Sequence, residues 1–231
     1  MRTLALLALT AIALQGCNTP GGHARPRLRL LGACPPPPPP RTANFFKPPL
    51  PDKSLPMRRV AMLPLSGGQV TPEALRDITA AFQAELSKKA LFEVVTVTGS
   101  ELEAMCGQRQ LSSVEPLPAH VLESLRERLG AEGVLFTDIT HLHAYRPISI
   151  GVRAKLVDIG SGAISWASDC VYDCGHPAVA ESARQFQRQF SDPHRSIPDD
   201  GGSVLISPAR FAKFVANATF NSLDGSPQAM Q

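Results

Sequence analysis

The sequence predicts an α/β domain in which helices pack on a mixed sheet of about five strands, in the order β-α-β-α-α-β-β-β-α-α. The apolar run "RRVAMLPL" (58–65) precedes an amphipathic helical pattern, as a buried strand precedes the helix that covers it. Three strand-like segments then follow one another between 132 and 173 with short connections, which is typical of antiparallel neighbours. Residues 58–231 are long enough to form one core of ordinary size.

The first half of this domain alternates strands with helices. Thr71 and Pro72 supply an N-cap and a first-turn proline, and Ser100 is expected to cap a shorter helix. Gly130 is expected to end the last helix of this half. The predicted elements are a strand at 58–65, a helix at 72–89, a strand at 92–97, a short helix carrying Leu102 and Met105, and a helix at 118–130.

The second half begins with the three adjacent strands and ends with two helices. Gly160-Ser161-Gly162 marks a tight turn between the last two strands, and Ser207 with Pro208 begins the final helix. The mixed-sheet domain is therefore predicted to span 58–231 without an internal repeat. Its remaining elements are strands at 132–144, 148–159 and 163–173, a helix at 178–190, and a last helix carrying Phe211, Phe214, Val215 and Ala218.

The amino-terminal 16 residues have the features of a secretory signal peptide. Arg2 precedes "TLALLALTAIAL" (3–14), an uncharged run too short to span the ~30 Å hydrocarbon core as a helix. Small residues follow near a cleavage site. An ordinary signal peptide, in which Cys17 is incidental, is one interpretation of this pattern.

Leu14-x-Gly16-Cys17 resembles the lipobox of bacterial lipoproteins. The resemblance implies that Cys17 becomes the first residue and carries a diacylglycerol and an amide-linked acyl chain such as palmitate. Asn18 stands where aspartate would favour inner-membrane retention in some bacteria, so the resemblance favours the periplasmic face of the outer membrane. Each buried methylene contributes roughly 0.8 kcal/mol, so several chains form a durable membrane anchor.

Residues 17–57 are predicted to form a lipidated, basic and proline-rich tether. They contain 12 of the 22 prolines, including the run 35–40, and six Arg or Lys against the single acid Asp52. Consecutive prolines favour an extended polyproline helix, and the segment has too few apolar residues to form a core. Residues 58–231 carry 16 basic against 19 acidic residues, so the basic pI belongs to the amino-terminal segment and does not indicate nucleic-acid binding.

Three segments together resemble a known family of small envelope domains: "RRVAMLPL", "LGAEGVLFTDI" (129–139) and "RAKLVDIGSGAISW" (153–166). They are similar to the α/β domain shared by CsgG-like curli-secretion lipoproteins, LpoB-type activators of penicillin-binding proteins and the amino-terminal domain of TolB. The resemblance spans roughly 58–173 and implies a domain without a catalytic residue set. Free-standing pairs of long alternating strands, which a CsgG-like pore requires, are not evident in the sequence.

The cysteines beyond Cys17 leave several interpretations open. Cys106, Cys170 and Cys174 are disulfide candidates in an oxidising periplasm, with Cys34 of the tether as another partner. Cys170 and Cys174 on one continuous strand lie about 13 Å apart, too far to bond, unless the chain turns near Cys174. Unpaired thiols, or a metal site that includes His176, are the alternatives, and we predict no metal and no cofactor.

His141 and His143 are the remaining candidates for acid–base chemistry. Strict strand alternation places both on one side of their strand and Asp138 on the other, which favours a polar strand end over a catalytic or metal site. Ser161 lies in a hairpin turn that lacks the helix and lysine of a phosphate loop. The sequence therefore predicts no enzyme, and an unrecognised periplasmic hydrolase is the least favoured alternative.

Four aromatic residues are candidates for contact with a protein partner, with burial in the core as the alternative interpretation. They are Trp166, Tyr172, Phe211 and Phe214. The leading hypothesis is an envelope lipoprotein whose domain binds another envelope protein, or a second copy of itself, as a regulator or accessory factor. A subunit of a CsgG-like secretion assembly is the second hypothesis.

Overall fold

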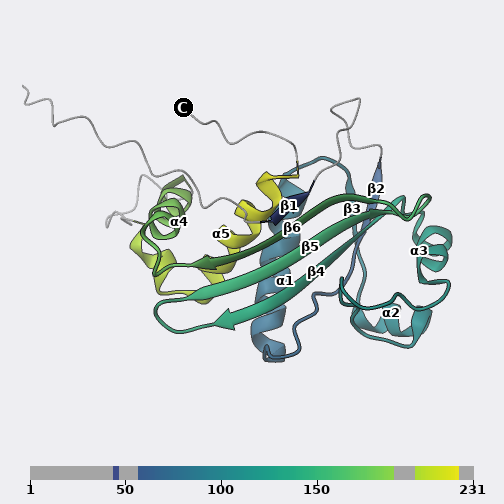
Figure 1. The fold of residues 1–231 in the computed structure, drawn as a ribbon, viewed down its shortest axis with the longest axis horizontal. Coiled ribbons are helices and arrows are strands. Elements are labelled where there is room, and N and C mark those ends of the chain that lie inside the picture. Colours follow the sequence, from purple (N-terminus) through teal and green to yellow (C-terminus); the bar gives the residue numbers. More distant parts are fainter. Residues whose placement is uncertain (1–43, 47–56, 190–200, 224–231) are drawn as a thin grey trace, which may run out of the picture. The chain divides into compact units, whose positions relative to one another are not determined.

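The protein's computed structural model describes residues 57–189 and 201–223 in full and residues 44–46 by their backbone (Figure 1). The predicted element order is confirmed, with one strand and one short helix added. The elements are β1 (Asn44–Phe46), β2 (Arg59–Met62), α1 (Pro72–Lys88), β3 (Glu93–Thr96), α2 (Gly99–Cys106), α3 (Val121–Leu129), β4 (Gly133–His143), β5 (Ser149–Asp158), β6 (Ile164–Asp173), α4 (Pro177–Gln189), the 3-10 helix η1 (Gly202–Leu205) and α5 (Pro208–Asn221).

The strands form one mixed sheet in the order β1-β6-β5-β4-β2-β3. β2 lies parallel to both β3 and β4, and long connections that contain helices join these strands. β4, β5 and β6 are long antiparallel neighbours, as their short connections predict. The turn at 158–163 closes when the Gly162 amide donates to the Asp158 carbonyl at 2.8 Å, which confirms the predicted glycine turn.

The domain begins earlier than the sequence predicts. Asn44–Phe46, within the segment predicted to be tether, pairs antiparallel with Ala167–Asp169 of β6. Met57 is also buried in the core, at the end of the same segment. The proline-rich composition of this segment concealed both positions. The signal peptide, Cys17 and Cys34 lie outside the described residues.

Side-chain caps fix where α1, α2 and α5 begin, and Ser207 with Pro208 begins α5 as predicted. Thr71 caps α1 as predicted, accepting a hydrogen bond from the Ala74 amide. The cap of α2 is Thr98 rather than Ser100, because Thr98 and Glu101 form a reciprocal capping box. The backbone hydrogen bond from Thr98 holds the pKa of Glu101 below its usual value. Ser100 therefore lies inside α2, which begins at Gly99.

Helices cover the two faces of the sheet to different extents. α1, α4 and α5 build the larger core on one face, around Phe82, Trp166 and Phe220. α2 and α3 build a smaller core on the other face, against Val134 and Phe136 of β4. In Figure 1, α1 runs behind β4 and β5, whereas α2 and α3 lie together near one end of these strands. Among the described residues, helices thus cover the second face at that end only.

One buried hydroxyl in the larger core has no hydrogen-bond partner within the described part of the chain. This group is Oγ1 of Thr137, a side chain that is 1% exposed on β4. We expect the Thr137→Val substitution to raise the free energy of unfolding by about 1 kcal/mol, because valine has the same shape and no polar atom to desolvate. Urea unfolding followed by circular dichroism measures this change. A loss of stability would show that the hydroxyl has a partner in solution.

Within residues 57–189 and 201–223, none of the helices combines the length and the apolar character needed to cross a bilayer.

Candidate functional site

The four aromatic residues proposed from the sequence as partner contacts belong to the core instead. Trp166 and Phe211 have no exposed surface, and Tyr172 and Phe214 are buried beside them. Desolvation raises the pKa of Tyr172 well above its usual value, so its hydroxyl stays neutral. Trp166 and Tyr172 point from β6 toward α5, whose apolar stripe, Phe211 and Phe214 included, packs in the same core. The interpretation of these four residues as a partner surface is therefore wrong.

No disulfide joins Cys106, Cys170 and Cys174, the disulfide candidates within the described residues. Cys106 lies in α2, at the smaller core, and its thiol donates to the Leu102 carbonyl at 3.3 Å. Cys170 and Cys174 belong to the larger core on the opposite face of the sheet. β6 continues to Asp173 before the chain turns, so the extended spacing between Cys170 and Cys174 prevents their pairing.

A β-bulge in β4 overturns the predicted positions of the two histidines. The register shifts between Ile139 and His141, so that one residue of β5, Gly151, faces an extra residue of β4. A Cβ atom on Gly151 would lie 2.5 Å from Thr140 Oγ1, so the bulge requires glycine here. The shift turns His141 and His143 onto the face that carries Asp138. Strict alternation had placed both histidines on the face opposite to Asp138.

His141 and Ser149 form the hydrogen bond expected of a base and a nucleophile, with 2.8 Å between Nε2 and Oγ. No hydrogen bond orients the other ring nitrogen of His141 within the described residues, whereas the His143 ring contacts the Pro147 carbonyl. A nucleophilic serine needs an oriented base and a site for the developing oxyanion. The same part of the chain holds no cluster of three or more side chains that could bind a metal ion.

We expect a fluorophosphonate probe to leave Ser149 unlabelled, because His141 lacks the third group that would hold it as a general base. Intact-mass spectrometry of the treated protein measures this, with a serine hydrolase as the labelling standard. An adduct that maps to Ser149 and disappears in the His141→Ala variant would instead support the hydrolase alternative.

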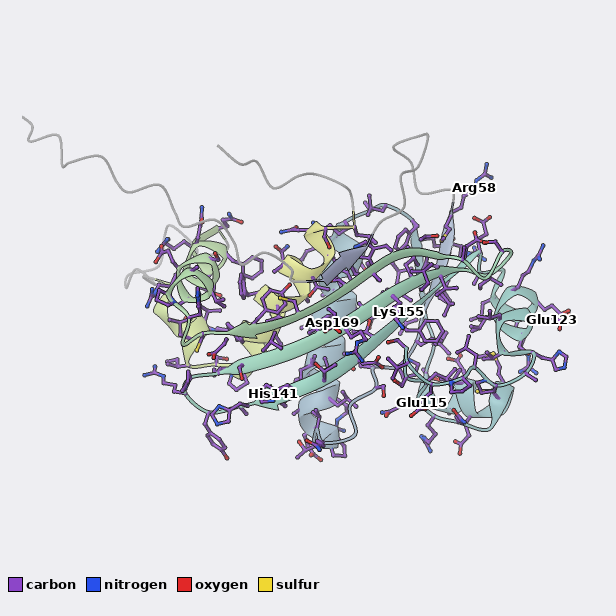
Figure 2. The ribbon with its side chains drawn as sticks, in the orientation of Figure 1. Arg58, Glu115, Glu123, His141, Lys155 and Asp169 are labelled. Atoms are coloured by element: carbon purple, nitrogen blue, oxygen red, sulfur yellow. The ribbon has the colours of Figure 1, made fainter. Side chains whose placement is uncertain are left out.

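Much of the face that carries Asp138 is polar and open. Arg153 and Asp169 form an ion pair at 2.7 Å between β5 and β6, and both side chains are one-third exposed. Val171, further along β6, is 56% exposed. Figure 2 places Lys155 and Asp169 near the middle of the sheet and His141 closer to the β4–β5 turn.

Asp138 and Lys155 on this face hold the loop that joins α2 to α3. The buried Asp138 carboxylate accepts hydrogen bonds from the Ser113 hydroxyl and from the Ser113 amide, the latter at 3.1 and 3.2 Å. The Lys155 ammonium donates to the Ser113 carbonyl at 2.6 Å. The hydroxyl, the amide and the carbonyl of Ser113 are thus hydrogen-bonded to side chains of the neighbouring strands β4 and β5. We call residues 107–120 the clamped loop.

The clamped loop presents apolar side chains to solvent. Leu111 anchors it in the smaller core, but Val114 is 61% exposed and Leu117 is 38% exposed. Loops of more than about 12 residues without secondary structure are uncommon in compact domains and often functional. This loop runs from the end of α2 at Cys106 to the start of α3 at Val121. Val114 and Leu117, exposed on a loop that hydrogen bonds hold to the sheet, make this loop a candidate protein-binding surface.

A groove of about 430 Å³ lies beside the clamped loop. Its walls come from the end of the loop, from the first two turns of α3, and from the turn after β5. The side chains that line the groove include Leu117, His120, Leu122, Glu123, Arg126 and Ile159. His120 has a left-handed backbone conformation, with φ +63°, and begins α3 without a side-chain cap. We take the clamped loop and this groove together as the candidate functional site.

This site could not be recognised in the sequence, because none of its residues forms a known motif. The available signal was the stretch "LSSVEPL" (111–117), in which apolar residues alternate with polar residues and a proline where no strand or helix is predicted. The partnership of Ser113 with Asp138 and Lys155 joins residues 25 and 42 positions apart, and only the fold brings them together.

We expect the Asp138→Ala substitution to lower the free energy of unfolding by about 1–3 kcal/mol, because the Ser113 amide and hydroxyl lose their acceptor. Hydrogen exchange of residues 107–120 should accelerate, since the clamp is broken. Asp169→Ala is the matched control on the same face: its partly exposed ion pair is worth at most about 1 kcal/mol. Unchanged exchange in the loop of the Asp138→Ala variant would contradict the clamp.

No family model and no curated protein matches this sequence. Among solved structures, the chain is similar to a PelC dodecamer from Paraburkholderia phytofirmans at 14% identity, with a TM-score of 0.40, covering 75% of this chain and 95% of that one. Lipoprotein GNA1162 from Neisseria meningitidis is similar at 15% identity, with a TM-score of 0.39, covering 73% and 98%. The LpoB carboxy-terminal domain from Salmonella enterica is similar at 14% identity, with a TM-score of 0.32, covering 49% and 81%. Similarity at this level assigns no activity or partner.

Proposed function

We propose that this chain is a lipid-anchored envelope protein whose domain binds another envelope protein through the clamped loop and the adjoining groove. In this proposal Cys17 carries the acyl chains, the proline-rich segment gives the domain reach, and the domain acts as a regulator or accessory factor rather than as an enzyme. The lipobox-like Leu14-x-Gly16-Cys17 and the tether composition support the anchor and the reach.

The observation that carries the binding proposal is the clamped loop itself. The Asp138 carboxylate is 6% exposed, so it is desolvated, and its hydrogen bonds go to a loop residue rather than to the core. The same loop leaves Val114 and Leu117 exposed to water, so their apolar surface does not contribute to the stability of the isolated domain. A partner that covered these side chains would bury that surface without first having to order the loop.

The test is photo-crosslinking in cells, with a benzoylphenylalanine residue in place of Leu117 and the full lipidated chain expressed at its native level. The control places the same residue at Arg76 of α1, whose side chain is 77% exposed and lies outside the clamped loop and groove. We expect one discrete protein adduct from position 117 and none from position 76. Adducts of equal yield at both positions, or none at position 117, would contradict the proposal.

The mass of the adduct also distinguishes the kind of partner. An adduct of twice the mass of the chain would indicate a second copy, as a homo-oligomer requires. An adduct of any other discrete mass would indicate a different envelope protein, which tryptic mapping of the crosslinked peptide then locates.

A further inference from the structure

The groove beside the clamped loop has an apolar floor formed by residues far apart in the sequence. Leu117 comes from the loop, Leu122 from α3 and Ile159 from the turn after β5. The smaller core lies directly beneath, because Leu122 and Ile159 pack against it. A volume of about 430 Å³ falls within the ~300–1,000 Å³ range of ligand-binding pockets, so the groove has room for large apolar side chains of a partner.

The charged groups around the groove are not equivalent. Glu123 has a partner within the domain: its carboxylate lies 3.2 Å from Nδ1 of His120. Arg126, one turn further along α3, also lines the groove and is exposed, and its side chain forms no ion pair with another residue of the described ranges. Figure 2 shows Glu123 projecting from α3 away from the sheet. Arg126 is therefore the charged group of this groove that is available to a partner.

A guanidinium at the edge of an apolar groove favours one kind of ligand. Its planar donors match a carboxylate in a bidentate pair, which is stronger and more directional than a neutral hydrogen bond. Apolar contact supplies most of the binding energy of such a site, and the ion pair supplies orientation and discrimination. The groove thus selects a segment that has a large apolar side chain and an acidic side chain close together.

We infer that the occupant of this groove is a peptide segment of a partner protein. In this segment an aspartate or glutamate lies within three positions of a Leu, Ile, Met or Phe residue. The apolar side chain enters between Leu117, Leu122 and Ile159, and the carboxylate pairs with Arg126. The chain's own tether contains such a pair, Leu50 and Asp52, but its six basic residues oppose binding beside the Arg126 guanidinium. This inference rests on the proposed protein-binding function and names its chemical specificity.

The test selects ligands from randomised nonapeptides displayed on phage, using the full chain in detergent as bait. We expect the recovered peptides to be enriched at least tenfold, relative to the unselected library, in sequences with Leu, Ile, Met or Phe within three positions of Asp or Glu. With the Arg126→Glu variant as bait, the acidic preference should be replaced by one for Lys or Arg. The Leu117→Ser variant should recover neither class above background.

Arg128→Glu is the matched control, because Arg128 lies on the same helix, is exposed and does not line the groove. It should leave the selected sequences unchanged, and circular dichroism of each variant verifies that the domain remains folded. Failure to enrich any peptide, enrichment without an acidic residue, or an acidic preference that survives Arg126→Glu would each overturn the inference. If position 117 still crosslinks a partner in cells, such a failure leaves the proposed function standing and removes only this specificity.

Discussion

We expect the Trp166→Ala variant to lose about 3–5 kcal/mol of its free energy of unfolding, the cost of removing a large aromatic side chain from a packed core. Trp166 has no exposed surface, its ring centroid lies 6.3 Å from that of Phe220, and its indole N–H donates to Ser222 Oγ at 3.2 Å. The substitution therefore removes the packing between β6 and the end of α5, together with one hydrogen bond. Urea unfolding monitored by circular dichroism measures the loss.

Val171→Ala provides the comparison on the same strand. Val171 faces the opposite side of β6 and is 56% exposed, so its substitution should change the free energy of unfolding by no more than about 0.5 kcal/mol. If Trp166→Ala were as mild as Val171→Ala, Trp166 would lie at a surface in solution. Its original assignment as a partner contact would then have to be reconsidered.

The second large effect concerns the proposed lipid anchor at Cys17. When Cys17→Ser is combined with a cleavable secretory signal in place of residues 1–16, we expect the protein to leave the membrane fraction and become soluble in the periplasm. Each buried methylene contributes roughly 0.8 kcal/mol, so losing several acyl chains should lower the membrane-bound fraction by far more than tenfold. Immunoblots of sedimented membranes and of the soluble fraction measure this partition.

Asn18→Asp, in the otherwise natural sequence, is the control for the anchor. Because it keeps Cys17, it should remain in the membrane fraction. Sucrose-gradient separation of the two membranes then shows whether the residue after the cysteine determines sorting in this organism. A Cys17→Ser protein that sediments with membranes as completely as the natural chain would show that something other than a lipid holds it there.

The regular elements of the domain could be predicted because local signals and the global fold agree. Pro72 and Thr71 begin α1, Gly130 in the left-handed conformation ends α3, and the turn at 160–162 joins β5 to β6 as expected. In each case the residue type and its backbone conformation have a direct physical link. The buried strand β2 could also be predicted, because both of its faces are covered and its sequence is therefore an uninterrupted apolar run.

The errors arose where one residue changes the outcome for a whole segment. Alternation through β4 holds as far as Ile139, but the bulge opposite Gly151 inserts one residue and reverses the faces of His141 and His143. No local pattern in "DITHLH" (138–143) reveals such an insertion, because it depends on the partner strand.

The aromatic residues and the candidate site were missed for a different reason. Trp166 and Tyr172 are consistent with either an exposed or a buried strand face, and only the position of α5 decides between them. Likewise, the role of Ser113 could not be predicted from the sequence, because only the fold places it against Asp138 and Lys155. Long-range contacts such as these follow from topology rather than from local sequence.

In the proposed function, the exposed apolar side chains of the clamped loop make this domain a protein-binding module. The most direct test is the dependence of the in-cell crosslink at position 117 on the clamp, compared in the natural, Asp138→Ala and Asp169→Ala backgrounds at equal protein levels. We predict that the adduct falls at least fivefold in the Asp138→Ala background and is unchanged in the Asp169→Ala background. An adduct of equal yield in all three backgrounds would contradict the claim, because binding would then not require the loop geometry that Asp138 maintains.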